Sequence, residues 1–122
     1  MLRLRVARIA WALSLASVAA AAAATDPPAS FAVCLGCHTV SAGAPNLAGP
    51  NLHGVAGRAA GSLRLFAFST AMSNSGIVWT RDELDRFLAS PATRVPGTSM
   101  TFAGIDDPAT RGEIIDYLQN AR

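Results

Sequence analysis

Hydrophobic positions recur at helical spacing in the segment that runs from Trp79 to Pro91. The stretch WTRDEL, residues 79–84, has a threonine and a glutamate at the spacing of a capping box, with a tryptophan and a leucine at the two staple positions. The apolar positions continue through Phe87 and Leu88, and proline cannot extend the interior of a helix. The pattern therefore predicts an amphipathic helix that starts after Thr80 and ends before Pro91.

The end of the chain repeats this arrangement. Asp107 stands at a capping position and Pro108 at a first-turn position, both favourable for a helix start. The apolar residues that follow share one helical face, and they are Ile114, Ile115, Tyr117 and Leu118. We expect a helix over most of residues 108–118.

The rest of the chain has weaker periodicity. Residues 25–30, TDPPAS, favour a helix start, and a short helix through Phe31 towards Cys37 is expected. Glycine, proline and asparagine are frequent in 39–62, and the segment 89–104 reads as a second loop, which disfavours long regular elements there. The sequence predicts an all-α fold with three main helices, short helices, long loops and no substantial sheet.

Residues 1–24 have the composition of a cleaved secretory signal peptide. Arg3, Arg5 and Arg8 precede an apolar run without acidic residues, and the run ends in small alanines. A retained membrane anchor is the alternative, but the run from residue 9 to 24 is short for a bilayer span and its second half is only alanine. We expect a single domain over residues 25–122, exported to the periplasm, or anchored at the membrane if the leader is kept.

Because of the predicted leader, the net charge of the whole sequence differs from that of the remaining domain. The formal charge of the whole sequence is +2, from ten basic and eight acidic residues. Three of the ten basic residues lie in the leader, so the remaining domain is close to neutral. A strongly basic surface for nucleic acid is therefore not indicated.

The segment CLGCHTV, residues 34–40, carries the most specific chemistry in the chain. It holds both cysteines of the sequence and one of its two histidines. Covalent haem attachment uses two thiols and a following imidazole at this spacing, because the thiols add to the haem vinyl groups and the histidine becomes an axial ligand. In an exported protein, CxxCH favours haem c.

Other uses of the two cysteines fit the sequence less well. A disulfide between Cys34 and Cys37 would close a very short loop and stabilise little. A zinc site lacks further cysteines, so that only His53 and carboxylates could complete it. A thioredoxin-like dithiol calls for alternating strands and helices, which the pattern does not show.

Beyond CxxCH, six blocks in order make the chain resemble the class I c-type cytochromes of the mitochondrial and bacterial c2 type. The blocks cover nearly the whole domain, and they are FAVCLGCHTV (31–40), GPNLHGVAGR (49–58), FSTA (68–71), SGIVWT (75–80), PGTSMTFAG (96–104) and IIDYL (114–118). The resemblance implies the cytochrome c fold, with helices and long loops wrapped around one covalent haem and the first and last helices crossing.

The resemblance also implies a role for individual residues. Cys34 and Cys37 would attach the haem, and His38 and Met100 would be the axial metal ligands. The second group of cofactor-binding residues would comprise Pro50, whose carbonyl orients His38, Arg58 and Trp79 near the haem propionates, and Thr98 in the segment of Met100. His53 stands at a position that resembles one without a ligand.

The sequence departs from the family pattern in its polar residues. Phe68 and Phe87 stand where tyrosines are usual, and Met72 where asparagine is frequent, which predicts a drier haem pocket. The chain contains no lysine, and Arg64 and Arg94 are the candidates for positive charge near the haem edge. We therefore expect weak electrostatic steering towards partners.

A third departure affects the crossing of the terminal helices. Pro27 and Pro28 shorten the N-terminal helix, so that its contact with the last helix, expected between Phe31 and Tyr117, is looser. Gly112 adds a cost inside the last helix.

These observations predict a monomeric one-electron carrier and not an enzyme. Its partners would be redox proteins, such as membrane cytochrome complexes, oxidases, reductases or dehydrogenases. The alternative is a haem protein with a labile distal ligand, acting in peroxidase-like chemistry or gas sensing, because Phe87 cannot support the distal methionine by a hydrogen bond.

Overall fold

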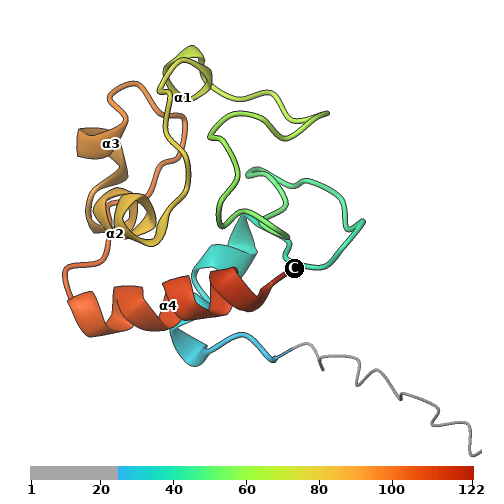
Figure 1. The fold of residues 1–122 in the computed structure, drawn as a ribbon, viewed down its shortest axis with the longest axis vertical. Coiled ribbons are helices and arrows are strands. Elements are labelled where there is room, and N and C mark those ends of the chain that lie inside the picture. The colour runs from blue at the N-terminus through green and yellow to red at the C-terminus, as the bar shows by residue number, and fades with distance from the viewer. Residues whose placement is uncertain (1–24) are drawn as a thin grey trace, which may run out of the picture.

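The computed structural model describes residues 25–122, and the predicted signal peptide lies outside the described residues. The helical elements follow one another along the chain as η1 (Ala29–Phe31), η2 (Cys34–Gly36), α1 (Thr70–Ser73), α2 (Arg81–Ala89), α3 (Pro91–Arg94) and α4 (Pro108–Asn120) (Figure 1). Within residues 25–122 no strand is formed, and the pairing of Ala59 with Val78 is an isolated bridge. The all-α prediction is confirmed.

Helix α2 begins as its sequence predicts. Thr80 is the N-cap, and its hydroxyl accepts a hydrogen bond from the amide of Glu83 at 3.3 Å. The reciprocal half of the capping box is missing, because the Glu83 carboxylate accepts from Arg94 Nε at 2.7 Å instead. That ion pair joins the start of α2 to the end of α3, which begins at Pro91.

Helix α4 is the longest element of residues 25–122 and packs against α2 and η1, as Figure 1 shows. Asp107 caps it by accepting from the Thr110 amide at 2.9 Å. The face predicted to be apolar is buried at Ile114, Ile115 and Leu118. Burial of this face holds α4 in place, because the hydrophobic contribution follows the apolar area removed from water.

Arg111 links α4 to α2 and to the loop between them. Its guanidinium donates to Asp85 at 2.7 Å and to the carbonyls of Ile105 and Asp106 at 2.8 and 2.9 Å. The amide of Ile105 in turn donates to the Leu88 carbonyl at 2.9 Å. The C-terminal end of the loop 95–107 is thereby fastened to both helices.

The N-terminal segment forms two short 3-10 turns, where the sequence predicted one short helix towards Cys37. Pro27 and Pro28 supply no amide donors, and the segment between Pro28 and Cys37 is bonded mainly at the tighter three-residue spacing. Phe31 is fully buried, and its ring lies 4.8 Å from that of Tyr117 between centroids. The predicted contact of the segment around Phe31 with helix α4 is present.

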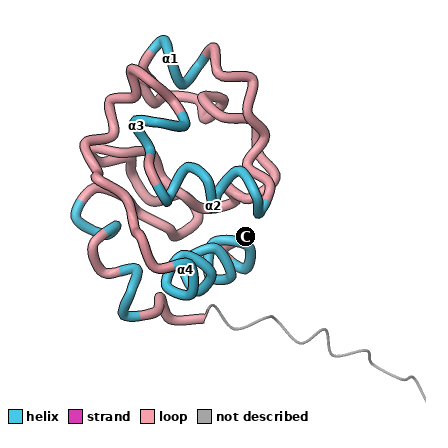
Figure 2. Tube along the Cα trace, turned by 90° about the vertical axis from the view of Figure 1, so that its left-hand side faces the viewer, coloured by secondary structure: helices cyan, strands magenta, loops and turns pink. Residues whose placement is uncertain are grey.

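Loops make up most of residues 25–122, as Figure 2 shows. The loop after His38 is ordered by side-chain amides: Asn51 Nδ2 donates to the carbonyls of Ser41 and Ala44 at 2.8 and 3.0 Å. The Asn51 amide donates to Asn46 Oδ1 at 2.8 Å. Asn51 is itself buried, so these bonds satisfy a polar group that would be costly to bury unpaired.

Candidate cofactor site

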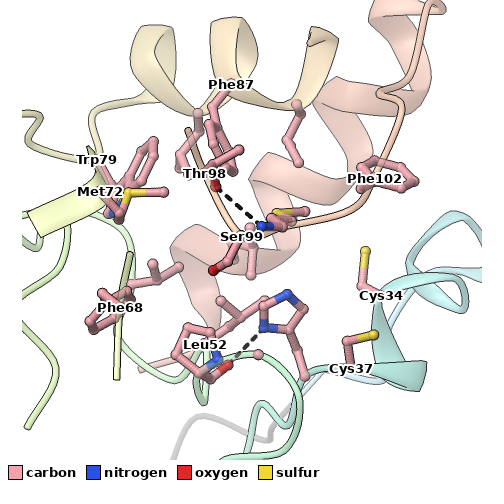
Figure 3. A pocket seen from close by; sticks show the side chains of 18 of the residues that line it. Cys34, Cys37, Leu52, Phe68, Met72, Trp79, Phe87, Thr98, Ser99 and Phe102 are labelled. Carbon is pink, nitrogen blue, oxygen red and sulfur yellow. Dashed lines mark hydrogen bonds between the residues drawn. The ribbon is translucent and has the colours of Figure 1, made fainter. Parts of the chain in front are cut away.

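A cavity of about 370 Å³ lies among the loops and helices, and all of the predicted site residues line it. Figure 3 shows part of its lining, with Cys37 and Leu52 on one side and Thr98 and Phe87 on the opposite side. The lining contains all eight residues predicted to hold the cofactor, which are Cys34, Cys37, His38, Pro50, Arg58, Trp79, Thr98 and Met100.

The two thiols lie on the same wall of this cavity (Figure 3). They flank the 3-10 turn η2, and Cys37 closes it by donating its amide to the Cys34 carbonyl at 3.1 Å. Both cysteines are free thiols. Burial, with a smaller contribution from Cys37, raises the pKa of the Cys34 thiol. The turn therefore presents two thiols side by side to one ligand.

His38 has a fixed ring orientation and a defined tautomer. Its Nδ1 lies 2.7 Å from the Pro50 carbonyl oxygen. A carbonyl only accepts hydrogen bonds, so Nδ1 carries a proton, and in the neutral ring the lone pair is on Nε2. A neutral imidazole held this way is the usual form of a histidine that binds a metal.

Gly49 leaves room for the His38 imidazole, a role that was not predicted from the sequence. A Cβ atom at Gly49 would clash with His38 Cε1 and would lie 2.7 Å from Nδ1 and 2.9 Å from Nε2. The amide of Gly49 donates to the Cys37 carbonyl at 2.8 Å, which holds the glycine against the ring. The sequence signal was the Gly-Pro pair at 49–50. The pair alone does not tell which side chain packs against the glycine.

Met100 lines the cavity from the loop 95–107. Its amide donates to the Thr98 hydroxyl at 3.3 Å (Figure 3), and the Thr98 amide donates to the Val95 carbonyl at 3.0 Å. These bonds fold the segment from Val95 to Met100 into a compact turn. A thioether in this turn faces the same cavity as the imidazole.

Arg58 and Trp79 are brought together by backbone pairing. The amide of Trp79 donates to the Arg58 carbonyl at 3.0 Å, and the amide of Gly57 donates to the Trp79 carbonyl at 2.8 Å. The guanidinium of Arg58 donates to the carbonyl of His53 at 3.1 Å and has no ion pair within residues 25–122. Burial lowers the pKa of Arg58. A cation without an acidic partner in a cavity wall suits a ligand that carries carboxylates.

The three positions that depart from the family pattern all line the cavity and make it apolar. Phe87 is buried and lies 4.9 Å from Trp79 between ring centroids. Phe68 packs edge-on against Phe66 at 4.7 Å, and Met72 is buried. None of these side chains has a hydroxyl or amide to offer to a ligand.

The other basic side chains considered from the sequence lie outside the lining. His53, Arg64 and Arg94 are not among the lining residues, and Arg94 is paired with Glu83. Among residues 25–122, no three histidine, cysteine or acidic side chains gather in a group that could hold a metal ion. A zinc site at Cys34 and Cys37 thus has no third protein ligand there.

Taken together, the lining fits a covalently attached haem. It offers two thiols on one wall, an imidazole nitrogen with a free lone pair, a thioether, an unpaired arginine and apolar walls. Each of these groups matches one part of a haem c: the vinyl groups, the iron, the propionates and the porphyrin faces.

Comparison with known proteins gives consistent relatives, although no protein-family model matches the chain. The chain is 48% identical over 88 residues to the "Cytochrome c homolog" of Bradyrhizobium diazoefficiens, covering 71% of this chain and 48%, about half, of that relative. It is 42% identical over 106 residues to cytochrome c2 of Blastochloris viridis, covering 85% of this chain and 84% of the relative.

A solved structure is also similar. Cytochrome cH from Methylobacterium extorquens matches with a TM-score of 0.70 and 43% identity, covering 74% of this chain and 90% of that one. The fold predicted from the resemblance is therefore confirmed.

Proposed function

Because this chain belongs to the class I c-type cytochromes, electron carriers with one covalently attached haem c, we propose that it is a periplasmic one-electron carrier in which His38 and Met100 ligate the iron. Cys34 and Cys37 form the two thioether bonds, since they are the cysteines of the chain. Residues 25–122 form the carrier domain, and residues 1–24 are its cleaved leader.

The bound haem supplies an iron that gains or loses one electron. The chain determines how that iron is held. Pro50 keeps the His38 ring in place through the bond of 2.7 Å, and the turn with Thr98 holds Met100. A soft thioether favours reduced iron and raises the reduction potential.

The remaining residues of the lining control the surroundings of the iron. Phe68, Met72 and Phe87 exclude water with apolar side chains. Arg58 offers its guanidinium, and Trp79 its indole, to the propionates. With His38 and Met100 both holding the iron, the protein would leave no open metal position for a substrate, so we assign no catalytic residue.

One observation carries this proposal. His38 is fixed with Nδ1 on Pro50 and Nε2 free, in a cavity that Met100 also lines. Two methionines of residues 25–122, Met72 and Met100, line this cavity, so the identity of the sulfur ligand can be tested directly.

The test is an optical spectrum of both oxidation states with a redox titration, on the wild type and two matched variants. Met100→Leu should abolish the red-region sulfur-to-iron band of the ferric protein and lower the potential. Met72→Leu should keep that band. Loss of the band in Met72→Leu with retention in Met100→Leu would contradict the assignment.

Phe87 supports a second candidate function, in which the distal ligand is labile and the protein binds gases or acts on peroxide. The residue is buried beside Trp79 and has no hydroxyl to hold a methionine sulfur. Rapid binding of carbon monoxide by the reduced protein at neutral pH would favour this function. Slow or absent binding favours the carrier.

The cellular location of the carrier and its redox partners are part of the same proposal. Within residues 25–122 no helix has both the length and the apolar character needed to cross a bilayer. We expect a monomer that exchanges electrons with oxidases, reductases, dehydrogenases or membrane cytochrome complexes. N-terminal sequencing of the exported protein should give Thr25 as the first residue.

A further inference from the structure

The loop that carries Met100 has few polar contacts with the rest of the protein. Among residues 25–122, the segment 96–104 makes no hydrogen bond to a residue outside the loop 95–107. Its own bonds are internal, from the Thr98 amide to the Val95 carbonyl and from the Met100 amide to the Thr98 hydroxyl. The position of Met100 therefore depends on packing and on how the two ends of the loop are held.

The C-terminal end of the loop is held by several bonds at once. The Ile105 amide donates to the Leu88 carbonyl at 2.9 Å, and the Arg111 guanidinium donates to the Ile105 carbonyl at 2.8 Å. The same guanidinium is paired with Asp85 of α2 at 2.7 Å. Loss of one of these bonds would leave the others in place, so this end of the loop is a fixed point.

The N-terminal end of the loop has one side-chain link to α2 besides the burial of Pro91 and Val95. Arg94, the last residue of α3, donates from Nε to the Glu83 carboxylate at 2.7 Å. The two side chains are 33% and 20% exposed, so water screens this pair less than an open surface pair. The hydrogen bond from Arg94 holds the pKa of Glu83 below its ordinary value, so the carboxylate is ionised at neutral pH. Arg86 is a more distant partner of Glu83, at 3.4 Å.

The ion pair of Glu83 and Arg94 acts on Met100 through the backbone. Arg94 is followed directly by Val95, which is buried and whose carbonyl starts the turn that contains Met100. If α3 moves away from α2, this turn moves with it, because no hydrogen bond of the segment 96–104 holds it back. The Phe87 ring cannot compensate, since it has no hydroxyl to hold a sulfur atom.

Resting on the ligation by His38 and Met100 proposed above, we propose that Glu83 and Arg94 are positioning residues for the distal ligand. Their ion pair holds α3 and the start of the loop 95–107 against α2 (Figure 1), and it thereby reduces how often the sulfur leaves the iron. Neither residue lines the cavity. The pair thus supports Met100 from outside the cavity, where Phe87 gives no support from inside.

Binding of imidazole to the ferric, haem-loaded protein measures how readily Met100 is released. Imidazole replaces the thioether as a ligand without electron transfer, and at saturating imidazole the release of the sulfur limits the rate. Disappearance of the red-region sulfur-to-iron band follows the reaction. Glu83→Gln and Arg94→Gln should each raise the limiting rate by roughly two- to fivefold, as expected for the loss of one partly exposed ion pair. The double variant should be no faster than the single variants, because all three lack the same interaction.

Asp116→Asn is the matched control. Asp116 forms an ion pair with Arg81 at 2.6 Å that joins α4 to α2, and neither residue lines the cavity. Its loss should leave the limiting rate unchanged, because this pair does not hold the loop of Met100. Arg94→Lys keeps a cation beside Glu83, so its rate should lie between those of the wild type and Arg94→Gln. Circular dichroism checks that each variant is folded.

Hydrogen exchange of the backbone amides, followed by mass spectrometry, gives a readout that does not depend on the haem spectrum. Exchange in the segment 96–104 should be faster in Glu83→Gln than in the wild type, and exchange in α4 should be unchanged. Unchanged imidazole rates in both single variants, rates that multiply in the double variant, or an equal increase in Asp116→Asn would overturn the positioning role. A wild-type protein without the sulfur-to-iron band would instead refute the ligation by Met100, and with it the proposed function.

Discussion

Of the substitutions that add one methyl group, Gly49→Ala should disturb the His38 side of the site most. The backbone of Gly49 is not in the left-handed region, so an alanine there meets no conformational strain. The penalty is steric: the new Cβ would lie 2.7 Å from Nδ1 and 2.9 Å from Nε2 of His38. The ring must move, and its bond to Pro50 lengthens or breaks.

The magnitude follows from these two effects. Overpacking of a filled site costs about 1 to 3 kcal/mol, and loss of the His38 hydrogen bond about 1 kcal/mol. We expect Gly49→Ala to reduce the free energy of unfolding by about 3 kcal/mol, which lowers the melting temperature by more than about 10 °C in a domain of this size.

Guanidinium unfolding of the haem-loaded protein, followed by circular dichroism and by haem absorbance, measures this effect. The absorption spectrum should also report an altered proximal ligand. A Gly49→Ala protein within about 0.5 kcal/mol of the wild type, with an unchanged spectrum, would refute the reasoning.

Three further predictions address the rest of the molecule. Gly112 lies inside α4, and a Cβ there would come no closer than 3.9 Å to Arg81 Nη2, so Gly112→Ala should stabilise the protein by about 1 kcal/mol in the same unfolding assay; destabilisation would contradict this. Hydrogen bonds from the Thr110 hydroxyl and amide hold the pKa of Asp107 below its ordinary value, so its stabilisation is present above the ordinary pKa and is lost as the pH falls through the folded-state pKa. Asp107→Asn keeps a capping side chain without this titration, and between about pH 5 and pH 2 the wild type should lose more stability than the variant; parallel curves would refute the assignment. Electron transfer to membrane partners should change by less than about threefold between low and moderate ionic strength, and a steep fall measured by stopped-flow absorbance would show that charge does steer docking.

Local sequence signals predicted the helix starts well. Thr80 and Asp107 cap α2 and α4 as expected, because an N-cap depends on residues within one turn. The capping box was only half correct, since Glu83 bonds Arg94 instead of turning back. That choice depends on where α3 returns in space, which the spacing of residues along the chain does not contain.

The sequence predicted which residues form the candidate site, but not how they are arranged in space. CxxCH and the six family blocks supplied the eight candidate cofactor residues, and the cavity lining contains all of them. The role of Gly49 was not predictable, because it arises when a loop folds under the ring of His38. The division of the N-terminal helix into two 3-10 turns was missed for a similar reason, since turn spacing in short segments is decided by packing, here of Phe31 against Tyr117.

One side chain, that of Asn51, links several parts of the loop after His38. Asn51 holds the carbonyls of Ser41 and Ala44 and accepts the amide of His53 through Oδ1, while its own amide is held by Asn46. Because these bonds link residues 41, 44, 46 and 53 through Asn51, we expect that neither end of the loop opens independently. Its amide protons should therefore exchange with solvent in one concerted opening event, making the segment a separate cooperative unit of the native protein.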